Sequence, residues 1–365
     1  MSSRLPAWAL SAAEGGALVV GVASVVAAVL LALPGAASAA PADDFRAAIA
    51  PVFQADEPLA LQRMRAVSPE GLDAGQRGVR ECMLARFSAA DPAATAPVDP
   101  AMPADLAAVL RAYRHYWTEV LMHRRTQAEA DAELSRALGT LLPGAPADLD
   151  GRSQAAVALA EARGWHALGG VTAPLQEFML WRSQQMSRER VALPGGDAMV
   201  SVSMLDGFAS FGWGAWGSCD RGHTGGWATA DGLMVVVPGW DLASEHYRVS
   251  LLAHESQHFA DYPRFPKLAS TDLEYRAKLT ELAIARDTQR ELLESFAASA
   301  RRERALPHPF AAWWVMAALR GTLGDRDPAT WPAEAVRAAA AQALAAHTAA
   351  LQARGAATVE SVLAD

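Results

Sequence analysis

A histidine, a glutamate and a second histidine stand at a spacing that can bind and use a metal ion. The pattern is H-E-x-x-H, and it lies in an apolar stretch that predicts a helix, with the residues His254-Glu255-Ser256-Gln257-His258. Two helical residues four positions apart lie about one turn apart on one face, so both imidazoles can bind one Zn²⁺. The glutamate between them can take a proton from a water molecule that the metal makes acidic. The alternative is a solvated helix face that has the pattern by chance, although the composition of the chain alone predicts roughly 0.01 such matches.

The motif helix is predicted to begin at Ser244, which can act as its N-cap, and to end before Pro263 and Pro266. Helical spacing places five residues on one face, Tyr247, Leu251, His254, His258 and Asp261. A second helix is predicted to begin at Thr271, after a short loop that lets the chain turn back. These two helices are therefore the elements that must position any ligands around the histidines.

These residues resemble the zincins, a superfamily of zinc metallopeptidases, and in particular the gluzincins, in which a glutamate on the next helix is the third ligand. The resemblance rests on His254, Glu255 and His258, followed by Glu274 in Glu-Tyr-Arg-Ala, and covers residues 230–285. It implies one Zn²⁺ held by the two histidines and Glu274, with Glu255 as the general base that hydrolyses a peptide or protein substrate. It also implies that the strand before the motif is an edge strand that holds an extended substrate beside the active-site helix.

The motif departs from two zincin subfamilies. Thermolysin-like members carry an aspartate four residues after the ligand glutamate, where this chain has Lys278. Metzincins carry a third histidine where this chain has Arg264. The departures leave the subfamily open.

The carboxylates near the motif have second interpretations. Glu274 can form a capping box with Thr271 instead of binding a metal. Asp261, three residues after His258, is either a rival ligand, an acceptor for a histidine N–H, or a charge at the helix end. Glu281, two turns beyond Glu274, can orient a ligand or lie on a solvated face.

A peptidase also needs a hydrogen-bond donor for the oxyanion that forms in the transition state. The candidates are Tyr247, Tyr262, Tyr275, His223 and His308. Each has an ordinary alternative as a core, loop or cap residue. The cluster of tryptophans at positions 213, 216, 227 and 240 can line a substrate cleft, but core packing is the simpler interpretation.

Residues 1–39 have the features of a signal peptide. Arg4 supplies a short basic region, residues 17–33 are apolar, and Ala37-Ser38-Ala39 is a typical cleavage signature. We therefore expect a mature chain from Ala40 that is exported to the periplasm or the medium, without stable membrane association. The alternative is an uncleaved N-terminal anchor. In an oxidising compartment Cys82 and Cys219 can form one disulfide, and the alternative is two buried thiols.

Residues 40–365 are predicted to form a single mainly α domain with a small antiparallel sheet, an α+β fold. Its helical N-terminal part, 40–190, includes helices over 104–139, 152–163 and 174–187. A zincin-like core, 195–290, contains a strand over 199–204, a hairpin over 227–238 with its turn at Asp231-Gly232, and the motif. Further helices are predicted over 272–303, 309–323 and 332–353. Residues 291–365 form the helical C-terminal part.

Composition limits the classes of function. The chain is 52% hydrophobic and 20% charged, which is typical of a folded protein, and its net charge of −8 argues against nucleic acid as a partner. The favoured function is an exported zinc metallopeptidase. The alternatives are an exported binding or structural protein with a closed zinc site that Asp261 completes, and a zinc amidase that acts on a non-peptide bond. The oligomeric state is not predicted.

Overall fold

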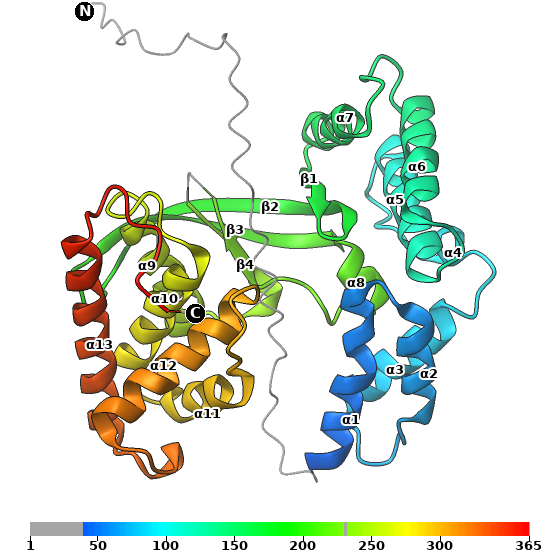
Figure 1. The fold of residues 1–365 in the computed structure, drawn as a ribbon. Coiled ribbons are helices and arrows are strands. Elements are labelled where there is room, and N and C mark those ends of the chain that lie inside the picture. The colour runs from blue at the N-terminus through cyan, green and yellow to red at the C-terminus, as the bar shows by residue number, and fades with distance from the viewer. Residues whose placement is uncertain (1–38, 230–231, 365) are drawn as a thin grey trace, which may run out of the picture.

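The computed structural model describes residues 39–229 and 232–364, which are mainly helical with one five-stranded sheet (Figure 1). The predicted α+β class is confirmed. The predicted signal peptide lies outside the described residues except for Ala39, which begins the first helix. Among the described residues, we find no helix with the length and apolar character that a membrane crossing requires.

An N-terminal group of helices lies at one end of the sheet (Figure 1). It comprises α1 (Ala39–Ile49), the 3₁₀ helix η1 (Ala50–Gln54), α2 (Glu57–Ala66), α3 (Ala74–Arg86), α4 (Pro92–Thr95), α5 (Ala104–Leu121), α6 (Gln127–Leu141) and α7 (Leu149–Ala162). The central helix is α5, whose Tyr113 and Trp117 are buried at the predicted helical spacing. The predicted helix over 104–139 is two helices, because α6 starts anew with a capping box between Thr126 and Glu129.

The sheet is mixed rather than antiparallel. Its strands are β1 (His166–Thr172), β2 (Leu175–Val191), β3 (Ala198–Phe211), β4 (Gly226–Ala228) and β5 (Leu233–Val236). Their order is β1-β2-β3-β5-β4, and every neighbouring pair is antiparallel except β3 and β5, which are parallel. The prediction of an antiparallel sheet is therefore wrong in this detail.

The predicted helix over 174–187 is also wrong, because this segment is β2, and β1 and β2 interrupt the predicted helical part 40–190. β2 pairs with β3 from Met179 to Val191, and the apolar run Phe178-Met179-Leu180-Trp181 is buried. The Gln, Met and Arg residues that follow favour a helix locally. Pairing with the long strand β3 overrides that preference, because β3 forms backbone hydrogen bonds with β2 along most of its length.

The strand before the motif helix is an interior strand. The predicted hairpin is present, since β4 and β5 are antiparallel neighbours, although the predicted turn residue Asp231 lies outside the described residues. β4 occupies the edge, and β3 pairs with the other side of β5. Leu233–Val236 is therefore not the predicted edge strand. The parallel pairing joins strands distant along the chain, which a hairpin pattern does not reveal.

A second group of helices lies at the other end of β2 and β3 (Figure 1). It comprises the π-helical segment η3 (Tyr247–Ala253), α9 (His254–Asp261), α10 (Ser270–Ile284), α11 (Gln289–Ser299), α12 (Pro307–Leu323) and α13 (Ala333–Ala353). Short elements complete the fold, namely α8 (Trp213–Gly217) and the 3₁₀ helices η2 (Val237–Gly239) and η4 (Pro328–Thr330). The predicted helix over 272–303 is divided into α10 and α11, because Glu245 accepts hydrogen bonds from the backbone N–H groups of Arg286 and Thr288 at the break.

Two contacts between distant segments fix the position of the motif helix and the segment after β3. Val202 and Val235 of the sheet share an apolar core with Tyr247 and Leu251 of η3, so the sheet holds the start of the motif helix. The predicted disulfide is present between Cys82 of α3 and Cys219, which follows α8. The side chains of Trp213 and Trp216 lie in the N-terminal core, as the simpler interpretation of the tryptophans predicts, and Trp227 and Trp240 are half-buried.

Candidate metal centre

The motif helix begins where the sequence predicts. Helical residues start at Glu245, and Ser244 Oγ accepts a hydrogen bond from the Tyr247 backbone N–H at 3.1 Å, as an N-cap does. The next residues form the π-helical segment η3, which passes directly into α9 at His254. A π-helical turn inside an α-helix is rare and frequent at functional sites. Here it immediately precedes the motif.

The two histidines and Glu274 converge. His254 Nε2 lies 3.4 Å from Glu274 Oε2, and His258 Nε2 lies 3.5 Å from Glu274 Oε1. One ligand atom from each residue lies within 4.8 Å of the others, and all three side chains are buried. Helices α9 and α10 therefore present two imidazole nitrogens and a carboxylate to one point, which is a group that can hold a metal ion.

The chemistry of these residues suits a metal ion. Glu274 Oε2 is buried and faces two histidine ring nitrogens, His308 Nδ1 at 2.8 Å and His254 Nε2 at 3.4 Å. A buried carboxylate needs positive charge or hydrogen-bond donors around it, and a metal ion held between the carboxylate and the imidazoles can supply that charge. Imidazole and carboxylate together are a common donor set for a divalent transition metal. His258 Nδ1 is buried without a hydrogen-bond partner, so none of the described residues orients this ring from behind.

Glu281 lies behind the first histidine. Its Oε1 is 2.7 Å from His254 Nδ1, which leaves Nε2 of the same ring directed at Glu274. Burial opposes the charged form of His254, but the charges of Glu281 and Glu274 prevail and raise its pKa to about 10. Glu281 thus has the position that the orienting role requires, because a hydrogen bond to one ring nitrogen fixes which nitrogen meets the metal.

Glu274 lies among three histidines and does not cap its helix. Helix α10 begins after Ala269 without a side-chain cap, so the capping-box alternative with Thr271 is excluded. His308, at the start of α12, places its Nδ1 2.8 Å from Glu274 Oε2. Burial alone would raise the pKa of Glu274, but His254, His258 and His308 hold it well below its usual value.

Asp261 is directed away from the metal ligands. Its two carboxylate oxygens accept hydrogen bonds from Arg276 Nε at 2.7 Å and Nη2 at 2.8 Å, and Gln257 Nε2 donates to Oδ2 at 2.9 Å. Asp261 is fully buried. It is therefore neither a rival ligand nor an acceptor for a ligand histidine. It is a charge at the end of α9, as the third alternative states, but it is buried and paired with Arg276. Its partner on the next helix, Arg276, was not among the predicted site residues.

Glu255, the candidate general base, is buried and unpaired. Its carboxylate makes no hydrogen bond or ion pair within the described part of the chain, and the residue is 6% exposed. The ring of Tyr262 stacks on His258, and burial and then the charges of Glu255 and Glu274 raise the pKa of the Tyr262 hydroxyl. A carboxylate free of protein partners is available for a water molecule or a substrate.

Of the five candidate oxyanion donors, the structure brings two to the site, His308 and Tyr262, whose ring stacks on His258 at 6.3 Å between centroids. The other three have different neighbours. Tyr247 packs edge-on against Trp240, Tyr275 lies 5.0 Å from the His347 ring, and His223 stacks on Phe211. Burial raises the pKa of Tyr247 and of Tyr275 to about 12, as expected for core tyrosines.

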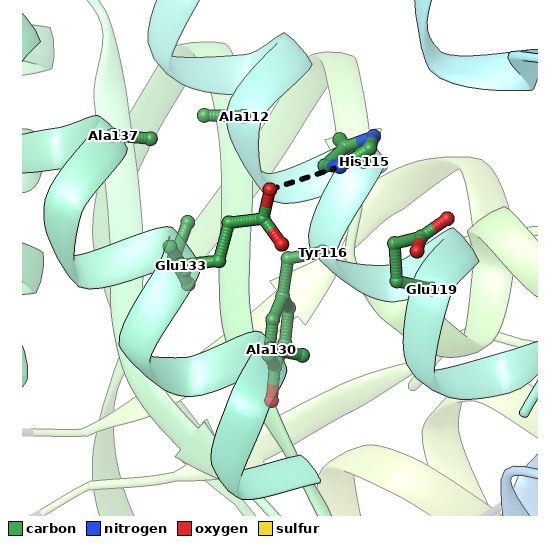
Figure 2. Close-up of a pocket in the computed structure, with 8 residues that line it drawn as sticks. Ala112, His115, Tyr116, Glu119, Ala130, Glu133 and Ala137 are labelled. Atoms are coloured by element: carbon green, nitrogen blue, oxygen red, sulfur yellow. Dashed lines mark ion pairs between the residues drawn. The ribbon is translucent and has the colours of Figure 1, made fainter. Parts of the chain in front are cut away.

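Two pockets elsewhere in the described residues lack the candidate metal ligands. A pocket of about 80 Å³ lies between α5 and α6. There Glu133 points toward His115 (Figure 2), with Glu133 Oε1 3.8 Å from His115 Nε2. Arg125 forms ion pairs with both carboxylates at this pocket, Glu119 at 3.3 Å and Glu133 at 2.9 Å, so neither carboxylate is free for a metal. A second pocket, of about 430 Å³, lies between α10, α12 and α13. None of the metal-binding candidates lines either one.

No protein-family model matches this chain, and searches of the curated proteins and of the solved structures found no similar protein.

Proposed function

We propose that this protein is a zinc-dependent metallopeptidase. One observation carries the proposal: His254, His258 and Glu274 converge within 4.8 Å of one another, and Glu255, between the two histidines in sequence, has no protein partner among the described residues. Two histidines and a glutamate are the ligand set of a known class of catalytic zinc sites, which keep one position for water or substrate. The resemblance to gluzincins, which rests on the same four residues, supports the same assignment.

A zinc ion held there would supply a Lewis acid that lowers the pKa of a water molecule to about 7. The protein's own residues then divide the remaining work. Glu255 accepts the proton of the attacking water and returns it to the leaving amine nitrogen. His308 and Tyr262 lie beside the ligands and are the described side chains best placed to donate to the oxyanion. Glu281 keeps the His254 ring in its orientation.

We place this activity outside the cytoplasm. The apolar segment 17–33 and the cleavage signature Ala37-Ser38-Ala39 support export. The disulfide between Cys82 and Cys219 independently favours an oxidising compartment, because such bonds are rare among cytosolic proteins.

The test is the metal content of the exported, processed chain, purified without chelator or metal-affinity resin. We expect about one zinc per chain, lost in His258→Ala and retained in Glu255→Gln. A peptide-library screen then compares the wild type with Glu255→Gln, which should lack turnover. A chain that folds but neither carries nor takes up zinc contradicts the proposal, as does full turnover in Glu255→Gln.

A second candidate is a binding or structural protein with a closed zinc site. The version in which Asp261 completes the site is lost, because Arg276 binds both oxygens of Asp261. His308 is the remaining candidate for a fourth ligand, because its Nδ1 lies 2.8 Å from Glu274 Oε2, although it is outside the group of three whose ligand atoms all lie within 4.8 Å of one another. The variant His308→Ala separates the two candidates. A closed site should lose most of its zinc affinity, whereas a catalytic site should keep zinc and lose turnover.

A further inference from the structure

The metal centre is divided between two helices that need not stay aligned. His254 and His258 belong to α9, and Glu274 belongs to α10, which runs back along it after the connection over 262–269. A slide of α10 by one residue along its axis would move Glu274 by about 1.5 Å. Metal–ligand distances tolerate about 0.2 Å. Contacts between the two helices must therefore fix the axial position of α10 relative to α9.

Apolar packing alone does not specify this position sharply. The contact between α9 and α10 is instead unusually polar for a buried surface. Gln257 accepts a hydrogen bond from Thr280 Oγ1 at 2.8 Å and donates one to Asp261 at 2.9 Å. The strongest contact is the two-pronged pair between Asp261 and Arg276, both of which are almost completely buried.

Arg276 is also held from its other side. Its Nη1 donates to Thr348 Oγ1 of α13 at 2.9 Å and lies 3.4 Å from His347 Nδ1. His347 Nε2 in turn lies 3.1 Å from Asp272 Oδ1, near the start of α10. The guanidinium therefore cannot follow Asp261 if α9 shifts, because α13 and the start of α10 hold it in place.

The physical role of such a pair differs from that of apolar contacts. A buried ion pair adds little net stability, because removing two charges from water costs about as much as their attraction returns. It does penalise misaligned states, in which a charge is left buried without its partner. A pair of this kind is best suited to specify one arrangement among several that pack equally well.

We propose that Asp261 and Arg276 position the metal ligands by fixing the axial register of α10 against α9. We call them the register pair. The inference rests on the proposed metal centre, but it concerns residues that touch neither the metal nor the substrate. Their loss should weaken metal binding more than it weakens the fold.

The experiment compares zinc affinity with thermal stability in the full processed chain. Arg276→Lys keeps the charge but loses the planar fork that binds both oxygens of Asp261. The double variant Asp261→Leu, Arg276→Met replaces the pair by apolar side chains of similar size. The control is Val315→Ala, a truncation in the apolar core of α12 that lowers stability without changing either residue of the register pair. Zinc affinity is measured by competition with a chromophoric chelator at a temperature at which all variants are folded.

We expect Arg276→Lys and the double variant to bind zinc 10- to 100-fold more weakly than the wild type, while both unfold cooperatively. Val315→Ala should melt at a lower temperature with unchanged zinc affinity. Wild-type affinity in both register variants overturns the inference and leaves the metal centre intact. The inference is also overturned if zinc affinity falls in proportion to the melting temperature in every variant, including Val315→Ala. If the double variant does not fold, Arg276→Lys alone decides. A wild type without zinc overturns the metal centre itself, and this inference with it.

Discussion

The buried carboxyl group of Glu57 makes the stability of this protein depend on pH. Glu57 is fully buried at the start of α2, and neither of its oxygens has a hydrogen-bond partner among the described residues. Burial raises its pKa from the ordinary 4.5 to about 8, although the charge of Arg86 opposes the increase. The folded protein therefore binds this proton more tightly than the unfolded chain does.

The sign of the effect follows from proton linkage. Below pH 4.5 both states hold the proton, and the contribution of Glu57 to folding is fully present. Between pH 4.5 and about 8 the unfolded chain releases the proton first, so stability falls as pH rises. The difference between the two pKa values, at about 1.36 kcal/mol per pKa unit, corresponds to a loss of about 5 kcal/mol at most.

The perturbation is Glu57→Gln, which keeps the shape and removes the titration. Urea unfolding, followed by tryptophan fluorescence at a series of pH values from 5 to 9, gives the free energy of unfolding for both chains. The wild type should lose stability towards pH 8 more steeply than the variant, by up to about 1.4 kcal/mol per pH unit. Glu177, whose pKa burial also raises to about 8, remains in both chains and contributes equally to each.

The control is Glu81→Gln, which makes the same charge change at an exposed position of α3. It should leave the pH profile of stability close to that of the wild type. Parallel profiles for the wild type and Glu57→Gln would refute the reasoning, because the Glu57 carboxyl would then titrate alike in the folded and unfolded chains.

Three further predictions concern the candidate site and the disulfide. Glu255→Gln should bind zinc as tightly as the wild type and lower turnover by about 10²- to 10⁴-fold, so unchanged kinetics would remove Glu255 as the base. Glu281→Ala should weaken zinc binding by about 10- to 100-fold, measured by chelator competition, and an unaltered affinity would show that the contact with His254 has no role in orientation. Replacing Cys82 and Cys219 by alanine opens a link between residues 137 apart and should lower the free energy of unfolding by about 2–5 kcal/mol in urea titrations; no change would mean that the link contributes nothing.

Segments whose hydrogen bonds and contacts are local were predicted well. Ser244 caps the motif helix as expected, because its partner is the backbone three residues later. The hairpin of β4 and β5 follows from a short-range turn pattern. β2 is an exception: its partner β3 follows directly after residues 192–197, but the helix-favouring side chains of β2 led to the prediction of a helix.

The same distinction applies to the residues around the metal centre. Asp261 was expected to act on the metal or at a helix end, since spacing alone places it one turn beyond His258. Its actual partner, Arg276, lies on the next helix, and the contacts of Arg276 with His347 and Thr348 join residues more than 70 positions apart. His308 was one of five candidate donors, and nothing in its sequence neighbourhood placed it beside Glu274.

The sequence by itself determined the chemistry that the motif helix can present, because the spacing of His254, Glu255 and His258 becomes geometry as soon as that helix forms. The third ligand and its surroundings depended on tertiary structure. Glu274 meets the histidines only because α10 turns back along α9 in one register, and His308 joins them only because α12 begins there. Helical periodicity extends over a few turns of one chain segment, whereas the alignment of two helices depends on packing and buried polar pairs between residues far apart in sequence.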